Sequence, residues 1–194
     1  MQPTNLRFQP PAAGLFNPLL LTKEDVDACF TLQEEIRAKL IKQGTPHYLK
    51  PLTKEGFAKH LEDGGEILGI RDEKGTLVAI ARLSFPANPN APELAENFPG
   101  IDLTNTAIVG GIGVIKNGFS LSSVLLEAAK QVAADHGCFA LVGKVALANK
   151  ASHHQFEKAD FGLAATGMDT KHDVLDADYA FACFRWPTPS FKVV

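Results

Sequence analysis

The sequence predicts a single α/β domain built on a sheet of mixed strand direction. Apolar runs rich in β-prone residues alternate with segments whose apolar residues recur at helical spacing. Hydrophobic residues make up 45% of the 194 residues, which suffices for one sizeable core. The expected order is β-α-α-β-β-β-α-β-α-β-β. We expect a loose N-terminal arm at 1–13, one domain at 14–187 and a tail at 188–194.

The first half of the chain is expected to hold a short strand, two helices and a hairpin. Thr22 is a candidate N-cap, and the helix that it opens should end at Gly44. Thr53 should open a second, shorter helix. The expected strands are residues 15–21, 66–71 and 76–85, the last two joined by the turn-like segment Asp-Glu-Lys-Gly.

The stretch 108–135 organises the second half. An apolar strand at 108–115 is broken by Lys-Asn-Gly, and a helical apolar period begins at Leu121. A strand that enters a helix through small residues leaves unpaired N–H groups at the helix start, where the dipole favours a phosphate. A plain strand–loop–helix connection capped by serines fits the same pattern. The later expected elements are a strand at 138–147, a helix from Asn149 and strands at 163–168 and 179–186.

Composition excludes several classes of function. A net charge of −3 without a basic run argues against a nucleic-acid partner. No apolar stretch approaches the length of a membrane span, and no secretory leader is visible. Cys29, Cys138 and Cys183 are odd in number and widely spaced, so neither a disulfide framework nor a metal site is expected. A cytoplasmic location fits best.

The segment after the organising strand carries a family resemblance. It reads Asn117-Gly118-Phe119-Ser120-Leu121-Ser122-Ser123-Val124-Leu125-Leu126. This is similar to the signature Gln/Arg-Gly-x-Gly-x-Gly/Ala of the GCN5-related N-acetyltransferase (GNAT) superfamily, although Asn117 replaces Gln/Arg and serines replace two glycines. Together with the element order, the resemblance covers the chain from Leu19 to Trp186. It implies a GNAT-like, mostly antiparallel central sheet flanked by helices.

The later helix adds to the resemblance. The family pattern there is Asn-x-x-Ala-x-x-Leu-Tyr-x-Lys-x-Gly-Phe, and this chain keeps Asn149, Lys158 and Phe161 in register, with Phe156 at the tyrosine position. Asn149 is either a ligand of the cofactor or a helix N-cap.

The resemblance implies that acetyl-coenzyme A (acetyl-CoA) is the cofactor and that an acyl group passes from its thioester to an amine. In the family, the turn before the helix holds the pyrophosphate, and the preceding bulged strand binds the pantetheine arm and polarises the thioester. The cofactor-binding residues so implied are Ile112, Gly113, Val114, Asn117, Gly118, Phe119, Ser120, Leu121, Ser122, Ser123 and Asn149.

Groups that could move protons are less well defined. Phe156 has no proton to give, but Ser152 and His153 lie four and three residues before it and share its helix face. Asp102 is a candidate base. The other candidates are Glu66, His47, Tyr48 and a water chain.

The amine substrate should lie near His47 and Tyr48, between the first two helices and the Asn/Pro-rich insertion at 86–103. A homodimer is left open as an assembly. The alternative function is a catalytically impaired module that binds an acyl-CoA or another protein.

Overall fold

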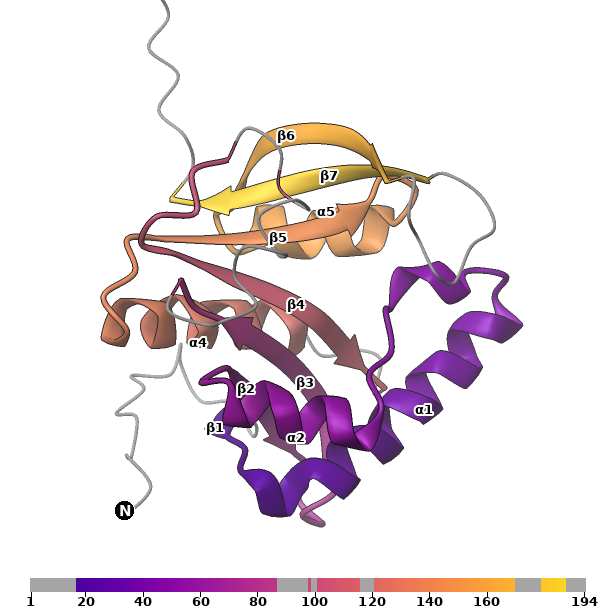
Figure 1. Cartoon of the computed structure of the whole chain (residues 1–194). Helices are drawn as coiled ribbons and strands as arrows, with labels where there is room; N and C mark the ends of the chain where they lie inside the picture. The colour runs from indigo at the N-terminus through magenta and orange to yellow at the C-terminus, as the bar shows by residue number, and fades with distance from the viewer. Residues whose placement is uncertain (1–16, 87–97, 99–100, 116–120, 170–178, 188–194) are drawn as a thin grey trace, which may run out of the picture.

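The computed structural model describes residues 17–86, 98, 101–115, 121–169 and 179–187. A seven-stranded sheet in the order β1-β2-β3-β4-β5-β7-β6 forms its centre (Figure 1). All neighbouring strands are antiparallel except β4 and β5. The strands are β1 (Leu19–Leu20), β2 (Glu66–Arg71), β3 (Leu77–Ser84), β4 (Thr106–Val114), β5 (Ala140–Ala146), β6 (Gly162–Asp169) and β7 (Tyr179–Trp186). The helices are η1 (Lys23–Asp25), α1 (Val26–Lys42), η2 (Pro46–Tyr48), α2 (Lys54–Glu62), α4 (Leu121–Asp135) and α5 (Lys150–Lys158).

This order of elements confirms the predicted mixed, mostly antiparallel sheet flanked by helices. The predicted arm at 1–13 and tail at 188–194 lie outside the described residues. None of the helices in the described part of the chain is long and apolar enough to cross a membrane.

The first strand is shorter than predicted. Within the described residues only Leu19 and Leu20 pair with β2, although the apolar run at 15–21 indicated a longer strand. Pro18 precedes the pair and has no N–H to donate to a ladder. After the pair, the Leu21 N–H still donates to the Ile67 carbonyl at 2.8 Å, and the helix cap begins at the next residue.

The predicted caps form at the helix ends. Thr22 makes a capping box, in which its N–H donates to the Asp25 carboxylate at 2.9 Å. The Thr53 hydroxyl accepts from the Gly56 N–H at 3.0 Å at the start of α2. Gly44, with φ 71°, follows α1, because glycine adopts this left-handed conformation without a steric penalty. Local side-chain chemistry therefore determines where these helices begin and end.

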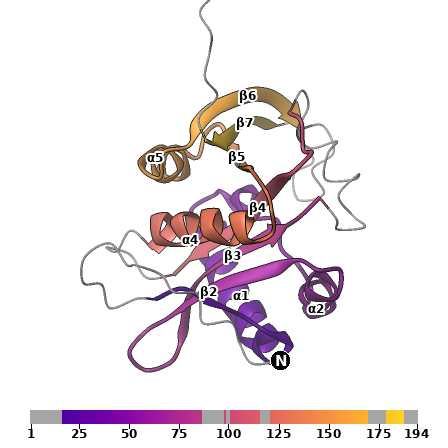
Figure 2. The same cartoon turned by 90° about the vertical axis from the view of Figure 1, so that its left-hand side faces the viewer.

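Helices cover both faces of the sheet (Figures 1 and 2). We call the face under α4 and α5 the α4 face, and the face under α1 and α2 the α1 face. The larger core lies on the α4 face and includes Leu125 of α4 and Phe156 of α5. The smaller core lies on the α1 face and includes Ile36 of α1 and Phe57 of α2. Each helix thus buries one apolar stripe against the strands.

A third cluster covers the part of the α1 face that α1 and α2 do not reach. Phe98, from the predicted insertion, is 4% exposed and packs there. Its buried neighbours are Ile108, Val142, Phe181 and Cys183. Most of the insertion lies outside the described residues.

One half-buried histidine is expected to make the stability of the fold depend on pH. The His60 Nε2 lies 3.2 Å from the Glu66 carbonyl oxygen. Burial lowers the pKa of His60 below its ordinary value of 6.5, and the hydrogen bond to Glu66 only partly opposes this effect. The unfolded chain therefore takes up the proton first as the pH falls, so this contribution to stability is present above pH 6.5 and is lost below it.

We accordingly expect the free energy of unfolding to be lower at about pH 5.5 than at about pH 7.5. His60→Gln, which keeps a side-chain donor but does not titrate, should show a smaller drop. Urea unfolding at the two pH values measures both. Equal drops in the two proteins would contradict the assignment to His60.

Candidate functional site

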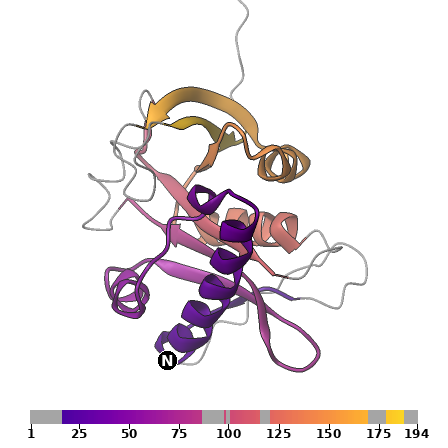
Figure 3. The ribbon, with the colours of Figure 1, turned by 90° about the vertical axis from the view of Figure 1, so that its right-hand side faces the viewer.

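Strands β4 and β5 pair only over their first halves. Their parallel register runs from Thr106 opposite Ala140 to Val109 opposite Gly143. Beyond these residues β4 continues paired to β3 alone, and β5 continues paired to β7 alone. Within the described residues, the backbone of 110–114 therefore has no strand partner on the side of β5. We call this divergence the splay; Figure 3 views the molecule from the side toward which both strands run.

A bulge in β4 adjoins the splay. Ile80 pairs with Gly113 and Arg82 with Gly110, so Gly111 and Ile112 together oppose one residue of β3. Gly111 has φ 56°, the left-handed conformation of the first residue of such a bulge. The extra residue interrupts the ladder and re-aims backbone N–H groups beside the splay. The resemblance implied a bulged strand near 112–114, and a bulge is found at residues 111 and 112.

Two further glycines let helices approach the splay from both faces. A Cβ on Gly113 would lie 2.7 Å from Cδ1 of Ile36 in α1. A Cβ on Gly143 would lie 2.5 Å from Cε1 of Phe156 in α5. Because a Cβ at either position would press on a helix side chain, the glycines let α1 and α5 pack directly against the strands where they diverge.

The first turn of α4 follows β4 and carries no acidic residue. Its N–H groups have no partner within the helix, so the turn suits an anion. The side chains of Leu121 and Ser123 make contacts within the protein. Leu121 is 1% exposed in the core, and the Ser123 hydroxyl donates to Gln155 Oε1 of α5 at 2.8 Å.

Several predicted residues fall outside what the structure describes. Asn117, Gly118, Phe119 and Ser120 belong to the segment between β4 and α4 that lies beyond the described residues. Of the predicted phosphate turn, only Leu121, Ser122 and Ser123 are therefore placed, at the start of α4.

Asn149 is the N-cap of α5. Its Oδ1 accepts from the Ser152 N–H at 3.1 Å, which is the capping role that sequence reasoning left open beside cofactor binding. The cap uses only the amide oxygen, so among the described residues the two N–H donors of the side chain stay available for a ligand. Asn149 follows β5 closely and therefore lies at the end of the splay.

Ser152 and His153 border the same end of β5. The His153 Nε2 lies 3.1 Å from the Ala146 carbonyl oxygen, and since a carbonyl only accepts, this nitrogen carries the proton. The ring also packs edge-on against Phe184, with centroids 5.1 Å apart. His153 thus ties α5 to the last residue of β5.

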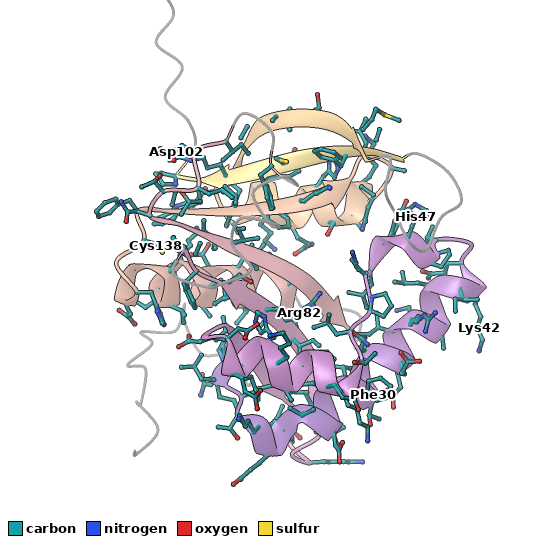
Figure 4. The ribbon with its side chains drawn as sticks, in the orientation of Figure 1. Phe30, Lys42, His47, Arg82, Asp102 and Cys138 are labelled. Atoms are coloured by element: carbon teal, nitrogen blue, oxygen red, sulfur yellow. The ribbon has the colours of Figure 1, made fainter. Side chains whose placement is uncertain are left out.

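The structure does not bring Asp102 to this site. Asp102 is an exposed residue that precedes β4, whereas the splay lies at the opposite end of that strand. Figure 4 shows Asp102 far from Arg82 and His47. Its carboxylate accepts from the Thr104 N–H at 2.8 Å, and this hydrogen bond lowers the pKa of the carboxyl. Asp102 therefore stabilises the turn before β4.

The other acidic candidate also lies elsewhere. Glu66 begins β2, and its Oε1 is 2.9 Å from the His136 Nε2, just after the C-terminal end of α4. The helix start and the splay lie at the other end of α4. Neither acidic candidate can therefore act on a ligand in the splay.

His47 and Tyr48 of η2 lie beside the end of β5. Their rings meet edge-to-face with centroids 4.7 Å apart. His47 forms one wall of an open, largely apolar depression of about 400 Å³. The depression is lined by His47, Ala146, Leu147, Ala148, Lys150 and Ala180. The structure thus brings the predicted substrate residues together with Ser152, His153 and Asn149 around the end of β5.

Sequence reasoning missed Arg82 of β3. Its guanidinium lies over the bulge: a Cβ on Gly111 would be 2.8 Å from Arg82 Cζ. Arg82 is labelled in the middle of the molecule in Figure 4, between β4 and the first two helices. The available signal was an arginine that interrupts the apolar alternation of 77–85.

The sequence matches no protein-family model, and no curated protein gives a significant match. Solved structures do match. An N-acetyltransferase from Staphylococcus aureus Mu50 has 18% identity and a TM-score of 0.65, covering 89% of this chain and 98% of that chain. The acetyltransferase of GNAT family from Streptococcus pneumoniae has 13% identity and a TM-score of 0.63, with 88% and 98% covered. YncA from Salmonella typhimurium, described as an acetyltransferase and solved with its cofactor acetyl-CoA, has 13% identity and a TM-score of 0.64, with 89% and 93% covered.

At these identities the likeness establishes the fold. The chain has the fold of the GNAT acetyltransferases, and the resemblance predicted from the sequence is confirmed at that level.

Proposed function

We propose that this protein is an N-acyltransferase that moves an acetyl group from acetyl-CoA to the amine of a small molecule or peptide. The observation that carries the proposal is the splay, an open strand edge inside a sheet, next to a bulge at Gly111. An extended ligand with amide groups can pair with such an edge as an added strand would. The N–H groups re-aimed by the bulge can then polarise a thioester carbonyl.

The residues present fit the parts of acetyl-CoA. The two amides of its pantetheine arm suit the open backbone of 110–114, and its diphosphate suits the first turn of α4, which has no acidic residue. The amide donors of Asn149 can bond the arm from the side of β5. Acetyl-CoA supplies the activated acyl group, so the chain itself has to bind, orient and exclude water.

Two proton transfers remain for the chain. Ser152 and His153 border the end of β5, and we propose that one of them delivers a proton to the departing thiolate. His47, Tyr48 or a water at the depression would take the proton from the amine.

The direct test is a calorimetric titration with acetyl-CoA, followed by thiol release with a panel of amines. We expect heat on titration and amine-dependent release of the thiol. No heat and no thiol release would reject the proposal.

Ser122→Asp should weaken the binding of acetyl-CoA at least about tenfold. The change puts a carboxylate into the first turn of α4, and two like charges a few ångströms apart near a protein surface repel by about 1–4 kcal/mol. Because an acid at a helix N-terminus stabilises the helix, the fold should not suffer. The matched control is Ala134→Asp, an exposed position in the last turn of α4, which should leave the affinity unchanged. Unchanged affinity in Ser122→Asp would remove the diphosphate from this turn.

One observation favours a second candidate, a module that binds acyl-CoA or a protein partner without turnover. Phe156 replaces the tyrosine that family members use as an acid, and the described strands β3, β4 and β5 contain no acidic side chain. Heat on titration without thiol release would identify this function.

A cytoplasmic location, a homodimer, a single domain at 14–187 and the lack of nucleic-acid and membrane partners stay predictions from the sequence.

A further inference from the structure

Arg82 holds a positive charge in a half-buried position, and no carboxylate of the described residues balances it. Its Nη2 donates to the Lys50 carbonyl at 3.4 Å, a long hydrogen bond, and it makes no ion pair with any residue in the described part of the chain. Burial lowers the pKa of Arg82 to about 10, so the guanidinium stays charged at neutral pH. A half-buried charge without a counter-ion costs free energy, which a bound anion would recover.

The surroundings of Arg82 leave room for such an anion. Gly110 pairs with Arg82 across β3 and β4, so both face the α1 side of the sheet. No described atom lies within 4 Å of the position that a Cβ on Gly110 would take. Within the described residues, the space above the Gly110 backbone, beside the guanidinium, is therefore free of side chains.

The same face carries a second cation. Lys144 of β5 follows Gly143, and its Nζ lies 4.2 Å from the centre of the Phe181 ring. Arg82 and Lys144 thus stand on the strands either side of Gly110. None of the described residues of β3, β4 and β5 is acidic, so the charged side chains that these strands carry are both cations.

We propose that Arg82 binds an anionic group of the acceptor, so that the substrate is an amine with a carboxylate or similar oxyanion a few bonds away, as in an amino acid. A guanidinium binds a carboxylate through two parallel hydrogen bonds, which also orients it. Because the guanidinium lies over Gly111, an anion held there places the amine beside the bulge. This inference rests on the proposed function and adds the class of its substrate.

The test compares amines that differ only in the carboxylate, namely phenylalanine with phenethylamine and leucine with 3-methylbutylamine. Wild-type protein should favour the amino acid of each pair by about 10- to 100-fold in kcat/KM, the size of a charged hydrogen bond. Arg82→Met should lose this preference, so that the two amines of each pair have similar kcat/KM values. Arg82→Lys keeps the charge but not the planar guanidinium, so its preference for the amino acid should lie between those of the wild type and Arg82→Met. Arg37→Met, at a side chain that is 41% exposed on α1, is the matched control.

Three measurements separate this inference from its alternatives. The melting temperature of Arg82→Met should equal or exceed that of the wild type, because an unpaired half-buried charge is removed; a clear fall would assign Arg82 a structural role and overturn the inference. An equal loss of activity for both members of each pair would place Arg82 at the thioester and also overturn it. Saturation-transfer NMR with phenylalanine and phenethylamine reports anion binding without turnover.

The two proposals can therefore fail separately. A wild type that binds acetyl-CoA by calorimetry but shows no preference between the paired amines would overturn the role of Arg82. A wild type that binds phenylalanine through Arg82 but gives no heat with acetyl-CoA would support that role and overturn the proposed acetyl transfer.

Discussion

Replacing Gly143 with valine is expected to lower the free energy of unfolding by about 3 kcal/mol. Gly143 is the last residue of β5 that pairs with β4, and a Cβ there would lie 2.5 Å from Phe156 Cε1 and 3.2 Å from Val109 Cγ1. The Phe156 side chain is 3% exposed. Its ring packs against Phe161 and Phe184 at centroid distances of 5.1 and 5.4 Å, so it has little room to move. Urea unfolding measures the loss.

Two further variants identify the cause. Gly110→Val makes the same change in the neighbouring strand, where no described atom lies within 4 Å of the new Cβ, and should change the unfolding free energy by no more than about 0.5 kcal/mol. In a Phe156→Leu background, Gly143→Val should cost less than in the wild type, because the ring that the valine meets is gone. Equal costs in both backgrounds would show that the destabilisation does not come from this contact.

Gly111→Ala is expected to slow acetyl transfer about 100-fold, the usual effect of losing one backbone donor to a developing oxyanion. Gly111 has φ 56°, and a methyl group there would meet the Arg82 guanidinium. Either the bulge opens or the arginine moves, and in both cases the N–H groups beside the splay change direction. Single-turnover thiol release with the best amine of the panel measures the effect.

Gly75→Ala is the control for backbone strain. Gly75 has φ 78° in the turn between β2 and β3, and no described atom lies within 4 Å of a Cβ there. The change should therefore cost only about 1–2 kcal/mol of left-handed strain and leave thiol release unchanged. A similar fall in turnover in both variants would attribute the effect to lost stability and not to the bulge.

The sequence determined the elements and most of their ends. The helical apolar period from Leu121 predicted α4, and the cap residues Thr22 and Thr53 marked the starts of the first two helices. These features depend on residues close together in the chain, so local pattern and hydrogen bonding suffice to predict them. The first strand was predicted too long because apolar character extends past Leu20, whereas pairing depends on the neighbouring strand.

The candidate site was predicted only in part. The resemblance pointed to the strand at 112–114, to Asn149 and to the residues around His47, and the structure brings these segments to the splay or the end of β5. Asp102, the candidate base, lies apart from these segments, because it precedes β4 whereas the splay is at the other end of that strand.

Only the tertiary structure decided that β4 and β5 part after Val109 and Gly143, that Gly111 forms the bulge and that Arg82 lies over it. Strand register and divergence depend on which helices pack on each face, here through Ile36 over Gly113 and Phe156 over Gly143. Such contacts join residues far apart in the chain. The side-chain alternation of a single strand does not encode its partner. The sequence alone therefore shows where the glycines are, but it does not show which side chains pack against them.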